Sequence, residues 1–120
     1  ACWGLTASYS VKGYNAHMPS NDHGVITPTA RLEQLSVYTG GILEGIEAFY
    51  FNLGDSIWGK YGFYDAFSEG ENWYPRRYLA IDQCTITPMI ENYRTGLLWR
   101  LFMSCPEIHG RFEEIGFHDP

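Results

Sequence analysis

Basic residues are scarce in this sequence, and long apolar runs are missing. Eight Lys and Arg stand against 14 Asp and Glu, which gives a net charge of −6, and only Arg76 and Arg77 are adjacent. Nucleic-acid binding depends on a concentrated basic surface, so a nucleic-acid partner is not expected. No apolar run approaches the roughly 18 residues that a membrane-spanning helix needs, so no membrane partner is expected either.

Cysteines are also few. Cys2, Cys84 and Cys105 are too scattered for a disulfide framework or a zinc site, although one disulfide with one free thiol is compatible with their number. His17 and His23 have a spacing that no local element enforces, which favours solvated loop histidines over metal ligands. No metal and no other cofactor is therefore expected.

Aromatic residues, in contrast, are abundant. They make up 17% of the 120 residues, with four Trp and nine Tyr, and apolar residues make up 45%. The length predicts one globular domain over 1–120, and the aromatic surplus in an acidic chain indicates flat, stackable ligands or a large interface. The first residues lack the basic and apolar regions of a signal peptide, and core-type Trp3 and Leu5 resemble a chain entered midway.

The first half of the chain predicts two helices after an irregular start. Glycine, proline and Asn-Asp interrupt every pattern in residues 1–27. Thr27 followed by Pro28 is typical of a helix start, with threonine as N-cap and proline at the first helical position. A second helix is expected to begin at Thr39, to follow apolar residues at 42, 46, 49 and 53, and to end at Gly54.

The strongest helical pattern lies in the second half, after an aromatic loop over 55–78. Apolar residues at 86, 90, 93, 97 and 101 predict one apolar stripe along a helix of several turns. This helix begins either at Asp82, with Pro88 inside it, or at Thr87-Pro88. A short last helix is expected over 107–117. The predicted fold class is all-α with long aromatic loops.

Two isolated acids in aromatic surroundings are the candidate site residues. Asp65 lies in F-Y-D-A-F and Asp82 in A-I-D-Q. The simpler interpretation of each is a turn or cap residue, because aspartate accepts backbone N–H bonds there. Glu91 and Arg94 are most simply an intrahelical ion pair, although they could brace a cleft wall. Glycosidases need carboxylates on both sides of the scissile bond and aromatic faces for the sugar rings, and only one acid stands out here.

Several segments resemble the glycoamylase-like domain family, which includes bacterial endo-β-1,2-glucanases, with a related domain in cyclic β-1,2-glucan synthases. They are W-G-L-T-A-S at 3–8, G-Y at 13–14, I-T-P-T-A at 26–30, Y-G-F-Y-D-A-F at 61–67, I-D-Q at 81–83 and M-I-E-N-Y-R-T-G-L-L-W at 89–99. The likeness covers nearly the whole chain and only the C-terminal part of the family domain. The Gly-Pro that usually follows the glutamine is replaced by Cys84-Thr85.

The resemblance implies that residues 1–120 are part of an all-α (α/α)6 toroid, roughly its last third, that hydrolyses β-linked glucan and in particular β-1,2-glucan. It implies Asp82 as a catalytic carboxylate, with the sugar contacts Gln83, Tyr64, Asp65, Trp73 and Trp3. The glucan is the expected partner, with an N-terminal portion or self-association as a second, and a periplasmic or secreted location is implied. The alternative is a non-catalytic carbohydrate-binding or structural fragment that needs its N-terminal partner.

Overall fold

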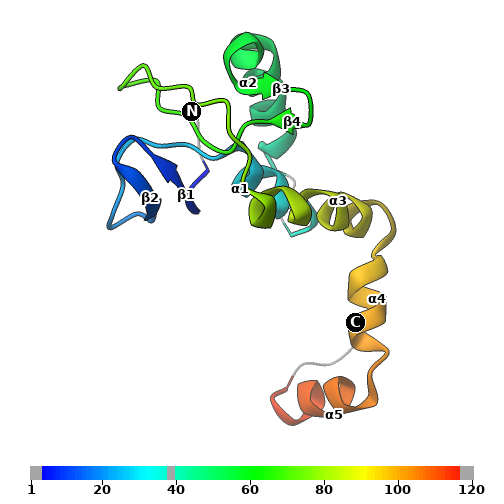
Figure 1. Cartoon of the computed structure of the whole chain (residues 1–120). Helices are drawn as coiled ribbons and strands as arrows, with labels where there is room; N and C mark the ends of the chain where they lie inside the picture. The colour runs from blue at the N-terminus through cyan, green and yellow to red at the C-terminus, as the bar shows by residue number, and fades with distance from the viewer. Residues whose placement is uncertain (1–3, 38–39, 117–120) are drawn as a thin grey trace.

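The computed structural model describes residues 4–37 and 40–116. Figure 1 shows a body of two small hairpins and three helices, from which two further helices extend as an arm. The elements in chain order are β1 (Ala7–Ser10), β2 (Gly13–Ala16), α1 (Pro28–Glu33), the 3-10 helix η1 (Gln34–Ser36), α2 (Ile42–Ile57), β3 (Trp58–Gly59), β4 (Gly62–Phe63), α3 (Ala80–Thr95), α4 (Leu97–Met103) and α5 (Pro106–Glu114).

The two hairpins show that the predicted fold class is wrong. β1 pairs antiparallel with β2, with Tyr9 opposite Tyr14, and β3 pairs antiparallel with β4, so the described residues hold two small sheets. Neither an all-α class nor a piece of an (α/α)6 toroid accounts for them. Residues 1–27 are not wholly irregular, and 55–78 is not all loop. The strands of two to four residues are too short to leave a clear alternating pattern.

The core forms where α2 packs against the second hairpin and the segment that follows it. The ring of Phe49 meets the rings of Phe63 and Phe67 edge to face, with centroids 6.4 and 5.6 Å apart. Ile57 belongs to the same buried cluster. The predicted apolar stripe of α2 faces this cluster, with Ile42 and Phe49 buried and Ile46 and Leu53 half-buried.

The ends of the helices confirm some of the predicted boundaries and correct others. α1 has Thr27 at its N-cap and Pro28 at its first position, as predicted. α2 continues through Gly54 to Ile57, so the predicted end at Gly54 is wrong. Its N-cap is Gly41, and the expected start at Thr39 lies outside the described residues.

α3 begins after Leu79, which occupies the N-cap position. Asp82 lies inside the first turn, and no side chain caps the helix, so the interpretation of Asp82 as the cap is wrong. The alternative start at Thr87 is also wrong. Pro88 lies inside the helix, which one of the two alternatives predicted.

The predicted long helix is divided at Gly96. This glycine has φ +67°, a left-handed conformation that ends α3 and starts α4. The buried Asn92 side chain caps α4, because its Oδ1 accepts a hydrogen bond from the backbone N–H of Trp99 at 3.1 Å. The single continuous stripe is therefore wrong, and its members Leu97 and Leu101 are exposed.

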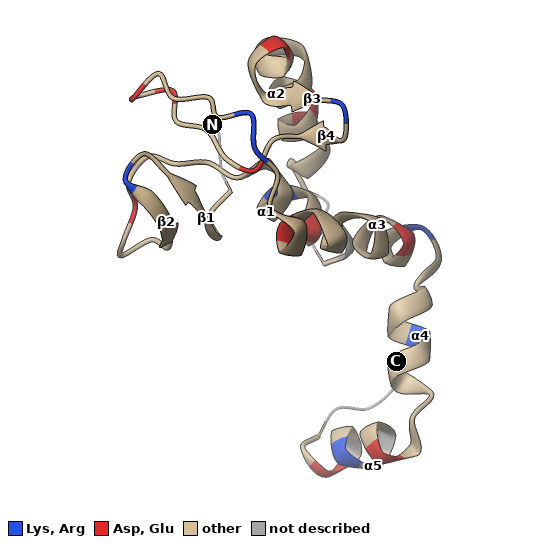
Figure 2. Cartoon of the chain, in the orientation of Figure 1, with Lys and Arg blue, Asp and Glu red and all other residues tan. Residues whose placement is uncertain are grey.

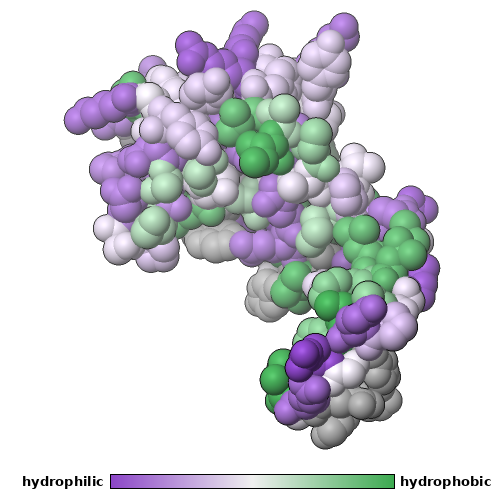
Figure 3. Space-filling model, turned by 60° about the horizontal axis from the view of Figure 1, so that its bottom comes forward, coloured by the Kyte–Doolittle hydropathy of each residue, from purple (hydrophilic) through white to green (hydrophobic). Residues whose placement is uncertain are grey.

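α4, the first helix of the arm, exposes apolar side chains along its length. Figure 3 shows hydrophobic side chains gathered along it. The exposed members on α4 are Leu97, Leu98, Trp99, Leu101 and Phe102. Because α4 and α5 extend from the body, the molecule is elongated, with extents of 50, 28 and 25 Å along its principal axes.

Charged positions are interspersed along the described chain in Figure 2, with no basic face on it. The predicted pair on α3 is present, with Arg94 Nη1 lying 3.9 Å from Glu91 Oε2 on the exposed side of the helix. Cys84 and Cys105 are free thiols. Within 4–37 and 40–116, no helix is long and apolar enough to span a membrane.

Candidate functional site

Asp82 is held at the first turn of α3 by its backbone. Its N–H donates to the carbonyl of Leu79 at 3.1 Å, and its own carbonyl accepts from Thr85 Oγ1 at 2.7 Å. The residue is only 8% exposed, and its Oδ2 is buried without a hydrogen-bond donor. The side chain is thus free of any capping role and is turned into the protein.

The carboxylate that Asp82 meets is that of Asp65, which follows β4. Asp65 is 0% exposed, and its backbone N–H donates to the carbonyl of Arg77 at 2.8 Å. Its Oδ2 accepts a hydrogen bond from the N–H of Tyr9 at 2.9 Å, whereas Oδ1 is buried without a donor. The side chain of Asp65 acts directly on the carboxyl of Asp82, so the structure brings together the two acids that the sequence singled out.

Burial and negative neighbours raise the proton affinity of Asp82. Burial is the largest cause of a pKa near 7, against an ordinary 3.8, followed by the hydrogen bond to Asp65 and the negative charges of Asp65 and Glu33. The position near the positive end of α3 favours the ionised form, and these effects outweigh it. Near neutral pH, Asp82 can therefore either hold or release a proton.

Gln83 connects this acid pair to an open depression. Its Nε2 donates to the carbonyl of Phe63 at 2.9 Å, and its side chain also lines the depression. The depression has a volume of about 450 Å³, and its other lining residues are Tyr61, Tyr78, Ala80, Cys84, Ile86 and Thr87. An amide beside exposed aromatic rings is a chemistry that suits a sugar.

Tyr64 packs behind one wall of the depression. Its ring lies 5.1 Å from that of Tyr78, and the ring of Tyr61 lies 5.5 Å from that of Tyr78. Tyr61 is 69% exposed, so this group of rings reaches the surface. Neither Tyr61 nor Tyr78 is a predicted site residue. Tyr61 lies in the motif at 61–67, whereas nothing local to Tyr78 could have identified it.

The predicted tryptophans are placed elsewhere or lie outside the described residues. Trp73 is half-buried and exchanges two backbone hydrogen bonds of 2.9 Å with Ser68, which close a loop. It does not line the depression. Trp3 lies outside the described residues.

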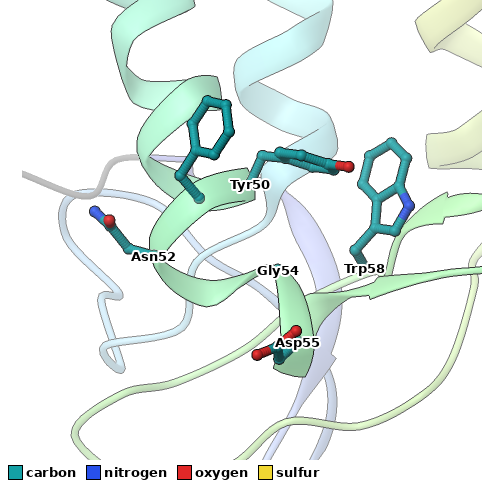
Figure 4. A pocket seen from close by; sticks show the side chains of 6 residues that line it. Tyr50, Asn52, Gly54, Asp55 and Trp58 are labelled. Carbon is teal, nitrogen blue, oxygen red and sulfur yellow. The ribbon is translucent and has the colours of Figure 1, made fainter.

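A second hollow of about 420 Å³ lies over the end of α2. Tyr50 and Trp58 meet edge to face there, with ring centroids 5.1 Å apart. Figure 4 shows the phenol of Tyr50 turned toward Trp58, whereas Asn52 and Asp55 point away from this pair. The polar groups do not converge, so this hollow is a weaker candidate than the acid pair.

The histidines do not form a metal site with other ligands. The rings of His17 and His23 lie 5.9 Å apart, and residues 4–37 and 40–116 contain no group of three or more His, Cys, Asp and Glu that could hold an ion. His17 is buried, so the expectation of a solvated histidine is wrong for it and holds for exposed His23. Burial lowers the pKa of His17, which favours its neutral form.

Comparison with known proteins gives consistent results. The sequence profile of the glycoamylase family, described as "Putative glucoamylase", matches residues 1–106. The exo β-1,2-glucooligosaccharide sophorohydrolase of Parabacteroides distasonis is 40% identical over 116 residues, which are 95% of this chain and 16% of that protein.

Solved structures agree with the sequence comparison. The endo-β-1,2-glucanase of Chitinophaga pinensis, in complex with sophorotriose and glucose, is 55% identical with a TM-score of 0.86 over 99% of this chain and 29% of its own. The β-1,2-glucanase of Parabacteroides distasonis is 41% identical with a TM-score of 0.81 over 91% of this chain and 16% of its own. The chain thus spans less than a third of these relatives.

Proposed function

This chain belongs to the glycoamylase family, and on that premise we propose that it supplies part of a glycoside hydrolase that cleaves β-1,2-glucan. The relatives named above are hydrolases of β-1,2-linked glucans by their names. Because the chain spans only 16–29% of their lengths, the activity belongs to the complete gene product that contains these residues.

The observation that carries the proposal is the buried carboxyl of Asp82, whose pKa lies near 7. Glycoside hydrolysis needs an acid that is still protonated at working pH and can give its proton to the glycosidic oxygen. An ordinary aspartate is ionised there, whereas the raised pKa of Asp82 lets this carboxyl hold a proton near neutral pH. Asp82 is accordingly assigned the role of general acid.

The sugar contacts follow from the surroundings of this acid. Gln83 and the tyrosine wall that includes Tyr64 lie beside the depression, and we assign them to a glucose-binding subsite. Trp73 and Trp3 are assigned to further subsites by resemblance alone, and Asp65 as a direct sugar contact likewise stays a prediction.

The test compares the complete gene product with its Asp82→Asn variant on linear β-1,2-glucan. Asparagine keeps the size of the side chain but has no proton to give, so kcat should fall about 10²–10⁴-fold. Binding of a β-1,2-glucooligosaccharide, measured by calorimetry, should survive. Asp55→Asn is the matched control, since Asp55 is exposed on α2 and does not line the depression, and it should keep full activity.

Two outcomes contradict the proposal in different ways. An Asp82→Asn variant that hydrolyses the glucan within a few-fold of the parent removes Asp82 from catalysis. A parent protein that binds the oligosaccharide and releases no reducing ends is a carbohydrate-binding protein instead. β-1,3- and β-1,4-glucans are the negative controls and should not be cleaved.

A further inference from the structure

We infer that Asp65 is a positioning residue for Asp82, and that the two buried carboxylates hold a single proton between them. This inference rests on the proposed role of Asp82 as general acid. It assigns Asp65 a function other than contact with the sugar.

The burial of both carboxyl groups, each with an oxygen that lacks a donor, favours a shared proton. Two ionised carboxylates only accept hydrogen bonds, so a hydrogen bond between them forms only when one of them is protonated. Asp65 Oδ1 and Asp82 Oδ2 are both buried, and neither has another donor. A proton shared by the two side chains supplies the missing donor, whereas two negative charges there would be left without compensation.

Asp65 is the fixed member of the pair. It is fully buried, its Oδ2 is held by the N–H of Tyr9, and its backbone N–H is held by the carbonyl of Arg77. The N–H of Tyr9 occupies one oxygen of Asp65, and Asp65 in turn raises the pKa of Asp82. The proton therefore resides mainly on Asp82, the member that retains some exposure.

Of the charged groups on the neighbouring elements, Glu33 acts on Asp82, whereas Arg31 and Arg77 contact other groups. Glu33 on α1 adds a second negative charge that acts on Asp82. The Arg31 side chain on the same helix donates to the carbonyls of Gly41 and Ile42. The guanidinium of Arg77 lies over the ring of Tyr9, 5.2 Å from its centroid.

One turnover returns the carboxyl pair to its starting protonation state. Asp82 gives its proton to the glycosidic oxygen as the bond to the anomeric carbon breaks, and the bonding electrons stay on that oxygen. The attacking water bonds to the anomeric carbon and loses one proton to solvent, and solvent returns one proton to the pair. The negative charge of Asp65 raises the affinity of Asp82 for the returning proton.

The test is the pH dependence of kcat/KM for the Asp65→Asn variant of the complete gene product. The asparagine side chain can still accept the hydrogen bond from Tyr9, and its amide donates to an ionised Asp82. The descending alkaline limb should therefore move to lower pH by about one unit or more. Glu33→Gln should shift the limb less in the same direction, and Asp55→Asn should leave it in place.

A purely structural role for Asp65 predicts a different result. Because asparagine preserves the bond to Tyr9, the limb would stay where it is, and that outcome overturns the inference. The role of Asp82 itself is tested separately by Asp82→Asn, so a catalytic Asp82 with an unmoved limb would reject the shared proton and leave the proposed function intact.

A second measurement covers the case in which the Asp65→Asn variant does not fold. The side-chain ¹³C resonances of the parent should show one aspartate carboxyl that titrates near pH 7 and disappears from that range in Asp82→Asn. A parent in which no carboxyl titrates between about pH 6 and 8 overturns the inference.

Discussion

Gln83 Nε2 donates a hydrogen bond of 2.9 Å to the carbonyl oxygen of Phe63, and this bond joins the first turn of α3 to β4. Asp82 precedes Gln83 by one residue, and Asp65 follows Phe63 by two. The bond therefore fixes the two segments that carry the buried acids. It connects the packing of the aromatic core, to which Phe63 belongs, with the chemistry of the pair.

Replacing Gln83 by methionine should destabilise the fold and loosen this connection. The side chain keeps its length, but the carbonyl of Phe63 loses a donor, which costs about 1 kcal/mol. Urea denaturation of the complete gene product measures the loss. Gln34→Met is the matched control on η1 and should change the denaturation midpoint little. Equal effects of the two changes would show that the bond to Phe63 contributes nothing.

Two glycines close together in the chain should respond to alanine in opposite ways. A Cβ at Gly59 would overlap the hydroxyl groups of Tyr64 and Tyr78, whereas one at Gly54 meets nothing within 4 Å. Gly59→Ala must displace the tyrosine wall and should cost about 1–3 kcal/mol. Gly54→Ala, inside α2, should stabilise the protein by roughly 0.5–1 kcal/mol. Thermal melting of both variants decides this, and a stabilised Gly59→Ala would show that the rings yield easily.

The start of α1 and the apolar side of α2 were predictable because their signals are local. Thr27-Pro28 marks the start of α1, and the apolar spacing on α2 identifies the side that faces Phe63 and Phe67. The β3–β4 hairpin was not predicted, because each strand has only two residues. Lys60-Tyr61, which joins them, carries no Asn-Gly or Asp-Gly signal. The break at Gly96 follows from its left-handed backbone, and Asn92 accepts a hydrogen bond from the first turn of α4; apolar periodicity reveals neither.

The candidate site, like the fold, could be predicted only in part. Asp65 and Asp82 were identifiable one at a time, because each is an isolated acid among apolar and aromatic neighbours. Their meeting was not predictable, since it depends on Tyr9 in β1 and on the bond from Gln83 to Phe63. Tyr78 reaches the site for the same reason, through packing against residues distant in the chain.

The raised pKa of Asp82 predicts how stability depends on pH. Its pKa is about 7 in the folded protein and near 3.8 when unfolded, so the folded state binds more protons between these values. The contribution of Asp82 to stability is therefore greatest below pH 4 and is lost as the pH rises toward 7. Asp82→Asn should remove this dependence.

Urea denaturation at pH 5 and pH 7.5 measures the effect. The free energy of unfolding of Asp82→Asn, taken relative to that of the parent, should be larger at the higher pH, because only the parent loses stability there. Asp55→Asn, on the surface, should show the same difference at both values. A relative stability of the Asp82→Asn variant that does not change with pH would place the pKa of Asp82 near its ordinary value.

The 120-residue chain by itself should associate through the arm. Five of the seven residues of α4 are exposed apolar side chains, and a continuous exposed apolar surface drives association. Replacing Leu98 and Leu101 by glutamate should leave the fold intact, since both are exposed, and should shift the chain toward its monomer mass of 13.7 kDa. Sedimentation velocity at several concentrations measures the mass. Val11→Glu with Val37→Glu adds the same charge at exposed positions outside the arm and should leave the association unchanged. A parent chain that is monomeric and melts cooperatively in dilute solution would show that this surface is too weak to hold chains together.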